Sequence, residues 1–243
     1  MHTYGVLGVG EIAGAMVTGL CDGVDDAPTV LLSPRNAERS AALAARYPSV
    51  AVAADNQAVI DGCATLVLSL RPQDARAVLG ELRFRPEQPV ISVIAGLSLA
   101  ELAAILGAPG ELARAIPLPP VARRAGVTPV HPGGEAASTL FDRLGGAAAV
   151  EDAGAFEAMS AASGTIAAHL EYQAAIADWL AGHGVPRAQA SRYVASIFAG
   201  VGGEASSYAT PGGINERFAA LLDEAGVFDA VRGSLDAILD GLA

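Results

Sequence analysis

The sequence of 243 residues contains no lysine, and all 15 of its basic residues are arginine. Schiff-base catalysis, a P-loop lysine and every dehydrogenase mechanism that needs a catalytic lysine are therefore excluded. Cysteine is nearly as scarce: Cys21 and Cys63 show neither C-x-x-C spacing nor a nearby histidine cluster. We therefore expect two buried thiols, with no disulfide framework and no metal site.

Long hydrophobic runs are also missing. No apolar segment reaches the roughly 18 residues that a membrane-spanning helix requires. The 52% hydrophobic content owes much to 52 alanines. The opening segment MHTYGVLGVGEIAG lacks the basic region of a secretory signal. A net charge of -11 opposes binding to nucleic acid. These features predict a cytoplasmic protein that binds neither membranes nor nucleic acid.

Strand and helix patterns alternate through the first two-thirds of the chain. Strands are expected at Thr3–Leu7, Thr29–Leu32, Ser49–Val52, Thr65–Leu70, Pro89–Val93, Leu112–Ala115 and Gly126–Val130. Helices are expected at Glu11–Leu20, Ala37–Tyr47, Asn56–Asp61, Gln73–Leu82, Ser98–Leu106 and Gly134–Leu144. Strands separated by helices form a parallel sheet through right-handed crossovers, with helices on both faces. Residues 1–150 are therefore predicted to form a doubly wound α/β domain.

The remaining residues, 151–243, predict a second domain that is entirely helical. Helical patterns cover Ala155–Ala181, Arg187–Ser207 and Asn215–Leu242, with breakers at Gly182–Pro186 and Thr210–Gly213. A helical bundle of this size has too little interior to bury all of its apolar residues. We therefore expect it to complete its core against a second copy of the same chain.

A glycine motif follows the first expected strand and opens the first expected helix. Gly8, Gly10, Glu11, Ile12 and Ala13 supply the pattern G-x-G-x-x-A of a Rossmann-type dinucleotide site. Gly8 permits the tight turn, Gly10 lets the backbone approach a pyrophosphate, and Ala13 lets the helix pack closely on the strand. The free N–H groups of the helix start then face the phosphates. The alternative is a plain glycine turn.

The end of the second expected strand indicates which dinucleotide is bound. NAD sites usually carry Asp or Glu there, whereas this chain has Ser33, Arg35 and Asn36 around Pro34. Arg35 is suited to pair with a 2′-phosphate, and Ser33 and Asn36 can donate hydrogen bonds to it. The pattern favours NADP. The alternative is that Ser33 or Asn36 caps the following helix and Arg35 is solvated.

Four segments of the first domain resemble, in order, those of a known family. They are GVLGVGEIAGAMVTGL, Ala54-Asp55-Asn56, Leu70-Arg71-Pro72-Gln73-Asp74 and Val90–Gly96. The family is that of the pyrroline-5-carboxylate reductases, in which these segments line the cofactor. The resemblance implies ribose contacts at Asn56, a wall on the adenosine side at Arg71 and Pro72, and nicotinamide contacts at Ala95 and Gly96. Leu70 is also expected to bind the cofactor.

The helical half resembles the family at Ala175–Asp178, Gly184–Pro186 and Thr210–Gly213, but departs from it elsewhere. The family's M-P-N-T-P is similar to Ile116–Pro120, with Leu118 at a polar position. Its S-G-S-G-P-A becomes Ser160–Thr165 without the proline, and its P-G-G-T-T has Ile214 in place of a threonine. The resemblance thus implies NADP use and a homodimer formed by the helical domain, with altered substrate loops.

Reduction of a cyclic imine depends mainly on holding the substrate beside the nicotinamide. Turns near helix starts offer N–H groups to a substrate carboxylate, and Ser163, Thr165 and Asn215 could add side-chain donors. Plain helix caps are the alternative. His169 and Tyr172 share a helix face and are candidate proton donors, although a lone helical histidine is more often structural. Trp179 is expected in the core.

The sequence thus predicts an NADP-dependent reductase of a cyclic imine carboxylate, most simply pyrroline-5-carboxylate going to proline. Two alternatives stay open. One is a reductase of another imine or carbonyl substrate on the same fold. The other is a non-catalytic NADP-binding paralogue, suggested by Leu118 and Ile214, which are apolar where the family is polar.

Overall fold

A computed structural model describes residues 2–107, 109–199, 201–209 and 211–242. Thr210, in the second expected breaker, and Gly200, in an expected helix, lie outside these ranges. The chain divides into two compact units, Met1–Phe156 and Glu157–Ala243. We call them the N-terminal and C-terminal units and describe each by itself.

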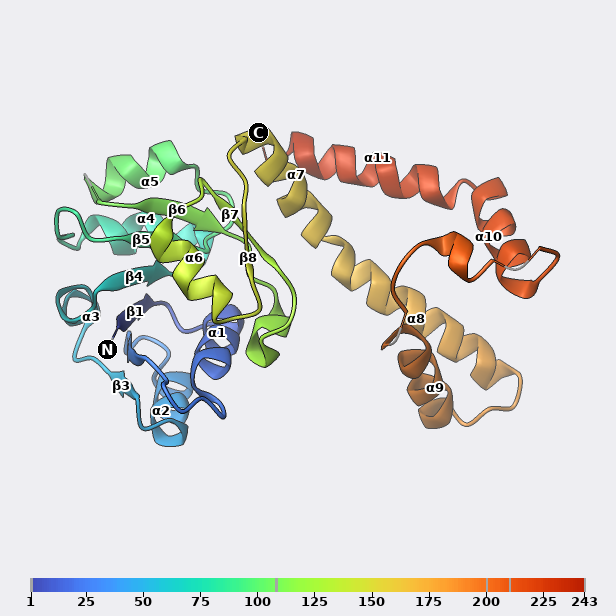
Figure 1. Ribbon diagram of the computed structural model, residues 1–243, viewed down its shortest axis with the longest axis horizontal. Coiled ribbons are helices and arrows are strands. Elements are labelled where there is room, and N and C mark those ends of the chain that lie inside the picture. Colours follow the sequence, from blue (N-terminus) through green and yellow to red (C-terminus); the bar gives the residue numbers. More distant parts are fainter. Residues whose placement is uncertain (1, 108, 200, 210, 243) are drawn as a thin grey trace. The chain divides into compact units, whose positions relative to one another are not determined.

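A single sheet runs through the N-terminal unit (Figure 1). Its strands are β1 (Thr3–Leu7), β2 (Thr29–Leu32), β3 (Val50–Val52), β4 (Thr65–Leu68), β5 (Val90–Ser92), β6 (Leu112–Ala115), β7 (Thr128–His131) and β8 (Ala147–Ala149). They lie in the order β3-β2-β1-β4-β5-β6-β7-β8. The order reverses direction at β1, which places the β1 turn at the switch point of a doubly wound sheet. The predicted fold class is confirmed.

Two features of the sheet depart from the prediction. Strand β7 is antiparallel to β6, and β8, which was not predicted, pairs parallel to β7. Between β6 and β7 the chain forms only the short 3-10 helix η1 (Pro119–Arg123), and the strand returns without a crossover α-helix. Strand β8 consists of three alanines, which have low strand propensity, so its sequence carried no signal.

Helices cover both faces of the sheet. They are α1 (Glu11–Cys21), α2 (Ala37–Arg46), α3 (Asn56–Gly62), α4 (Pro72–Gly80), α5 (Leu99–Leu106) and α6 (Glu135–Asp142). One buried cluster includes apolar side chains of α1 and α6, and a second includes those of α3, α4 and α5. Cys21 and Cys63 are buried and unbridged, as predicted, and burial raises the pKa of Cys63 to about 11.

The start of α5 is fixed by a reciprocal capping arrangement between Ser98 and Glu101. The Glu101 backbone N–H donates to Ser98 Oγ at 3.2 Å, and the Ser98 N–H donates to Glu101 Oε2 at 3.0 Å. Arg76 of α4 also pairs with the Glu101 carboxylate. The hydrogen bond from the Ser98 backbone, followed by those from Arg76 and the Ser98 hydroxyl, lowers the pKa of Glu101 to about 2.

Glu101→Gln is expected to lower the melting temperature at pH 7 by about 2–4 °C. Because the pKa of Glu101 is about 2 in the folded chain against an ordinary value of 4.5, its carboxylate stabilises the fold above about pH 4.5. That contribution is lost as the pH falls through about 2, so the difference between wild type and variant should shrink over this window. Thermal melts across the window measure it. Glu135→Gln, in the first turn of α6 where Gly134 provides no side-chain cap, is the control.

The C-terminal unit is helical, as predicted, but its helices are shorter. They are α7 (Ala153–Ser163), α8 (Thr165–Gly182), α9 (Arg187–Ala199), the 3-10 helix η2 (Ala205–Ser207), α10 (Ile214–Glu224) and α11 (Val227–Asp240). The predicted continuity of three helices is wrong. The first is interrupted at Gly164, the second ends before Gly202 and Gly203, and the third breaks at Gly226, whose φ of 72° is left-handed.

Few side chains of the C-terminal unit are buried, and many large apolar ones are exposed. The buried cluster consists of Ala177, Ala190 and Val194. Trp179 is 62% exposed in the single chain and packs on His183, with 4.1 Å between ring centroids, so its predicted core position is wrong. Among the described residues, none of the helices is long and apolar enough to span a membrane.

Candidate nucleotide-binding site

The glycine turn after β1 has the geometry that its sequence predicts. Gly8 has a φ of +91°, and a Cβ there would lie 2.4 Å from the Ser69 carbonyl oxygen, so only glycine fits. Gly10 caps the N-terminus of α1, and a Cβ there would meet no atom within 4 Å. Ala13 is 1% exposed against the sheet. The start of α1 therefore has open space beside its unpaired N–H groups.

A pocket of about 400 Å³ opens at this turn. Its lining residues are Gly8, Val9, Gly10, Arg35, Asn36, Ser69, Leu70, Arg71 and Asp74. They come from the segments that follow β1, β2 and β4, which are neighbours in the sheet. The structure thus brings together six of the residues predicted from sequence, namely Gly8, Gly10, Arg35, Asn36, Leu70 and Arg71. A pocket at the carboxyl ends of parallel strands is where doubly wound sheets bind ligands.

Hydrogen bonds of Ser33 and Asn36 connect the turn after β1 with the turn after β2. The Gly8 N–H donates to Ser33 Oγ at 2.9 Å, and Ser33 itself is 1% exposed. Asn36 Nδ2 donates to the Val9 carbonyl at 2.9 Å. Asn36 Oδ1 accepts from the Arg39 N–H at 3.4 Å, so the alternative that Asn36 caps α2 is confirmed. Their donation to a nucleotide phosphate stays a prediction.

Charge in the pocket is carried by Arg35, Arg71 and Asp74. The side chains of Arg35 and Arg71 are 54% and 71% exposed, so both guanidinium groups reach solvent. Asp74 is the one acidic residue among the described residues that line the pocket. It lies on α4 rather than at the end of β2, where a ribose-binding acid usually lies.

The other predicted cofactor residues do not line this pocket. Glu11 pairs with Arg39 and its side chain is 86% exposed, while Ile12 packs against the core. Asn56 is the first residue of α3, and Pro72 the first of α4. Ala95 and Gly96 form an exposed turn after β5. Contacts of these residues and of Ala13 with a cofactor stay predictions.

The polar residues predicted to hold a substrate lie in the C-terminal unit, where each bonds locally. Ser163 Oγ donates to the Ser160 carbonyl at 2.6 Å, and Thr165 Oγ1 donates to the Ala162 carbonyl at 2.8 Å. Asn215 Nδ2 donates to the Tyr208 carbonyl at 2.9 Å. All three side chains therefore have local partners that a substrate would replace or share.

His169 and Tyr172 lie on one face of α8, as their spacing predicts. Both rings approach Phe198 of α9, with centroid distances of 5.7 Å and 5.9 Å. His169 Nε2 also lies 2.7 Å from Gln173 Nε2. A catalytic role for either residue stays a prediction. No group of three or more metal-binding side chains forms within the described ranges.

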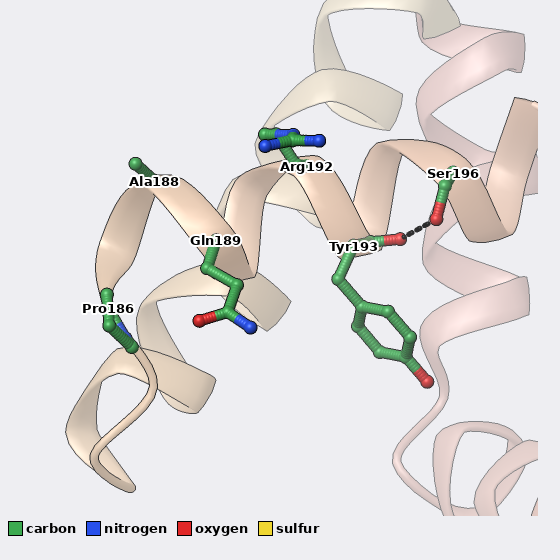
Figure 2. A pocket seen from close by; sticks show the side chains of 6 residues that line it. All are labelled: Pro186, Ala188, Gln189, Arg192, Tyr193 and Ser196. Atoms are coloured by element: carbon green, nitrogen blue, oxygen red, sulfur yellow. Dashed lines mark hydrogen bonds between the residues drawn. The ribbon is translucent and has the colours of Figure 1, made fainter.

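A second hollow, of about 650 Å³, lies along α9 in the C-terminal unit (Figure 2). It is lined by Pro186, Ala188, Gln189, Arg192, Tyr193 and Ser196. One helix and the residue before it supply all of its walls, and none of the residues predicted to bind cofactor or substrate is among them. We therefore place the candidate nucleotide site in the N-terminal unit.

Asp74, Val9 and Ser69 line the pocket but were not predicted as site residues. Val9 lies between the two glycines of the motif, so the motif itself carried its signal. Asp74 is the last residue of the segment Leu70–Asp74, which resembles the pyrroline-5-carboxylate reductases. Ser69 precedes that segment, and only the sheet topology reveals that it faces Gly8.

Comparisons with known proteins agree with the fold. Residues 3–96 match the family model described as "NADP oxidoreductase coenzyme F420-dependent". The 1-pyrroline-5-carboxylate reductase of Streptococcus pyogenes superposes with a TM-score of 0.79 at 24% identity, covering 99% of this chain and 97% of the other. A reductive aminase from Aspergillus terreus superposes with a TM-score of 0.59 at 16% identity, covering 82% and 72%. The chain therefore has the fold of nucleotide-binding oxidoreductases.

Two curated relatives show which oxidoreductases the chain is similar to in sequence. The chain is 30% identical over 168 residues to the pyrroline-5-carboxylate reductase of Pseudomonas aeruginosa, a match that covers 65% of this chain and 61% of the relative. It is 28% identical over 216 residues to the enzyme of the same name from Mycobacterium tuberculosis, covering 82% and 72%. In sequence the chain is thus similar to pyrroline-5-carboxylate reductases, and it spans 61% and 72% of the length of these two relatives.

Proposed function

We propose that this protein is an NADPH-dependent reductase of a cyclic imine carboxylate, most simply of pyrroline-5-carboxylate to proline. The observation that carries the proposal is the pocket in which an open helix start at Gly10 lies beside the exposed guanidinium groups of Arg35 and Arg71. The names of the curated relatives support the substrate class. A solved relative from Plasmodium falciparum, with a TM-score of 0.78 and 15% identity, has NADP bound.

The residues of the pocket fit a phosphorylated dinucleotide. The open side of Gly10 leaves room for a pyrophosphate against the N–H groups of α1. Arg35 and Arg71 offer planar donors to a 2′-phosphate. Asn56, Pro72, Ala95 and Gly96 lie outside the pocket lining, and their contacts with the cofactor stay predictions. When bound, NADPH supplies a hydride from its nicotinamide ring.

We assign to the chain's own residues the orientation of the substrate beside the nicotinamide. We assign binding of the substrate carboxylate to backbone N–H groups at the start of α8, near Thr165, and of α10, near Gly213, with Ser163, Thr165 and Asn215 as additional donors. An imine that arrives protonated needs no strong acid from the protein, and His169 or Tyr172 would serve a less basic substrate.

We also propose that the C-terminal unit forms a homodimer. The exposed fractions of Trp179, Leu221 and Ile214 are 62%, 61% and 86%, whereas the unit buries only a small cluster of its own. A second copy would remove such surface from water. Sedimentation at micromolar concentration tests the assembly, and a monomer under all conditions would refute it.

The reaction is tested by following the loss of NADPH absorbance with a panel of cyclic imine carboxylates, alongside direct titration of NADPH binding. Turnover of pyrroline-5-carboxylate supports the proposal, and turnover of another imine or a ketone identifies a different reductase. Tight NADPH binding without turnover of any substrate would instead indicate a non-catalytic nucleotide-binding protein. That second candidate is favoured by Ile214, which is apolar and exposed where the family has threonine.

Cofactor choice has its own test in Arg35→Asp. We expect this variant to weaken NADPH binding by about 30-fold and NADH binding by less than about threefold, because NADH lacks the 2′-phosphate. Dissociation constants for both nucleotides measure the effect. Arg83→Asp makes the same charge change outside the pocket lining and is the control. Equal losses for NADPH and NADH would remove Arg35 from the phosphate site.

A further inference from the structure

One carboxylate oxygen joins the two arginines of the pocket. Asp74 Oδ2 accepts from Arg35 Nη2 at 3.4 Å and from Arg71 Nε at 3.0 Å, and Arg71 Nη2 lies 2.9 Å from the same oxygen in an ion pair. Arg35 follows β2 and Arg71 follows β4, so the two side chains converge on this oxygen from different turns. Three guanidinium nitrogens thus lie within 3.4 Å of a single carboxylate oxygen inside the pocket.

The three side chains differ in how firmly they are held. Asp74 lies in the first turn of α4, its N–H donates to the Arg71 carbonyl at 3.0 Å, and its side chain is 25% exposed. Arg35 and Arg71 are 54% and 71% exposed. A short acidic side chain on a helix stays in place, whereas long exposed arginines exchange partners at little cost.

A carboxylate that binds two guanidinium groups uses the same donors that a phosphate would use. A 2′-phosphate entering the pocket would have to draw these donors away from Asp74, and would also meet its negative charge. The contact with Arg35, at 3.4 Å, is too long to fix that side chain in one orientation. For Arg35, competition with the phosphate is therefore a larger effect of Asp74 than positioning of the side chain.

We propose that Asp74 is a specificity-determining residue that acts as an internal counter-ion, occupying Arg35 and Arg71 and thereby limiting the affinity for a nucleotide with a 2′-phosphate. The inference rests on the proposed NADPH site. It has a direct consequence: removal of the Asp74 charge strengthens binding of NADPH and leaves NADH nearly unaffected. Damage to the structure would produce the opposite result, since it would weaken binding of both.

The test is Asp74→Asn, which keeps the shape of the side chain and removes its charge. We expect the dissociation constant for NADPH to fall by about 3- to 10-fold, and that for NADH to change by less than about twofold. The gain should shrink in about 0.5 M salt, because the effect is electrostatic and partly exposed. Asp229→Asn is the matched control: Asp229 also lies in the first turn of a helix and pairs with an arginine three residues away, outside the pocket.

The outcomes distinguish failure of the Asp74 inference from failure of the proposed cofactor choice. Weaker NADPH binding by Asp74→Asn would show that Asp74 orients the arginines and would overturn the inference, as would unchanged binding or an equal gain for NADH. A similar gain in Asp229→Asn would attribute the effect to net charge and overturn it too. If the wild-type protein itself binds NADPH no better than NADH, the proposed cofactor choice fails. Melting temperatures of both variants report whether the fold is intact.

Discussion

Gly10→Ala is expected to weaken NADPH binding by about 100-fold or more while the melting temperature stays nearly unchanged. A Cβ at Gly10 meets no protein atom within 4 Å, so the fold can accept it. The methyl group would instead occupy the space beside the start of α1, where a pyrophosphate must approach the backbone. Titration of NADPH and a thermal melt of the same preparation measure the two effects.

Gly14→Ala is the matched control for this prediction. Gly14 lies one turn farther along α1, and its Cβ would make ordinary contact with Arg39 Cδ at 3.8 Å. We expect unchanged NADPH binding and a small gain in stability, since alanine favours a helix interior over glycine. Gly8→Ala should differ from both, because its Cβ would clash with the Ser69 backbone and destabilise the fold. Normal NADPH binding by Gly10→Ala would contradict the placement of the pyrophosphate.

The nucleotide-binding turn could be predicted because its chemistry is local. The left-handed φ of Gly8 is a property of the turn itself, and Asn36 caps the helix that directly follows it. Strands β1 to β6 could likewise be predicted, because short runs rich in β-branched or apolar residues lie between helical segments. Within these stretches, local preference and tertiary structure agree, which is why the expected positions and the observed ones coincide closely.

The features that were missed depend on partners distant in sequence. The direction of β7 follows from its pairing with β6, and the all-alanine strand β8 exists only because β7 offers an edge. The link between Asp74 and Arg35 spans 39 positions, which no local pattern shows. Arg124 likewise donates to the carbonyls of Gly19 and Asp22 at 3.0 Å and 2.9 Å at the end of α1, which lie 105 and 102 positions away.

The C-terminal unit was predicted less well for a different reason. Alanine-rich helices carry a weak periodic signal, so the glycines at 164 and 226 were absorbed into longer helices. Trp179 was placed in the core because tryptophan is usually buried, but a single chain of this unit has too little interior for it. The side chain of Trp179 is therefore left largely exposed on the single chain.

An unusual group of side chains is buried where β6 and β7 meet. Phe156 is 1% exposed, and Arg114 and His131, which are opposite each other in the β6–β7 pairing, are each 8% exposed. The Arg114 guanidinium lies 4.9 Å from the centre of the Phe156 ring, and the His131 ring lies 5.5 Å from it. His131 Nδ1 is also 2.8 Å from the Val150 carbonyl. Phe156 therefore shields two polar side chains from water.

Phe156→Ala is expected to lower the free energy of unfolding by about 3–5 kcal/mol, because it leaves a cavity and removes the ring that Arg114 and His131 contact. Equilibrium unfolding in urea measures the loss, and amide exchange should quicken in β6 and β7 before other strands. Val127→Ala, at a side chain that is 62% exposed, should cost less than about 0.5 kcal/mol. A loss below about 1 kcal/mol for Phe156→Ala would mean that water or a neighbouring side chain replaces the ring, and that the buried arginine does not depend on it.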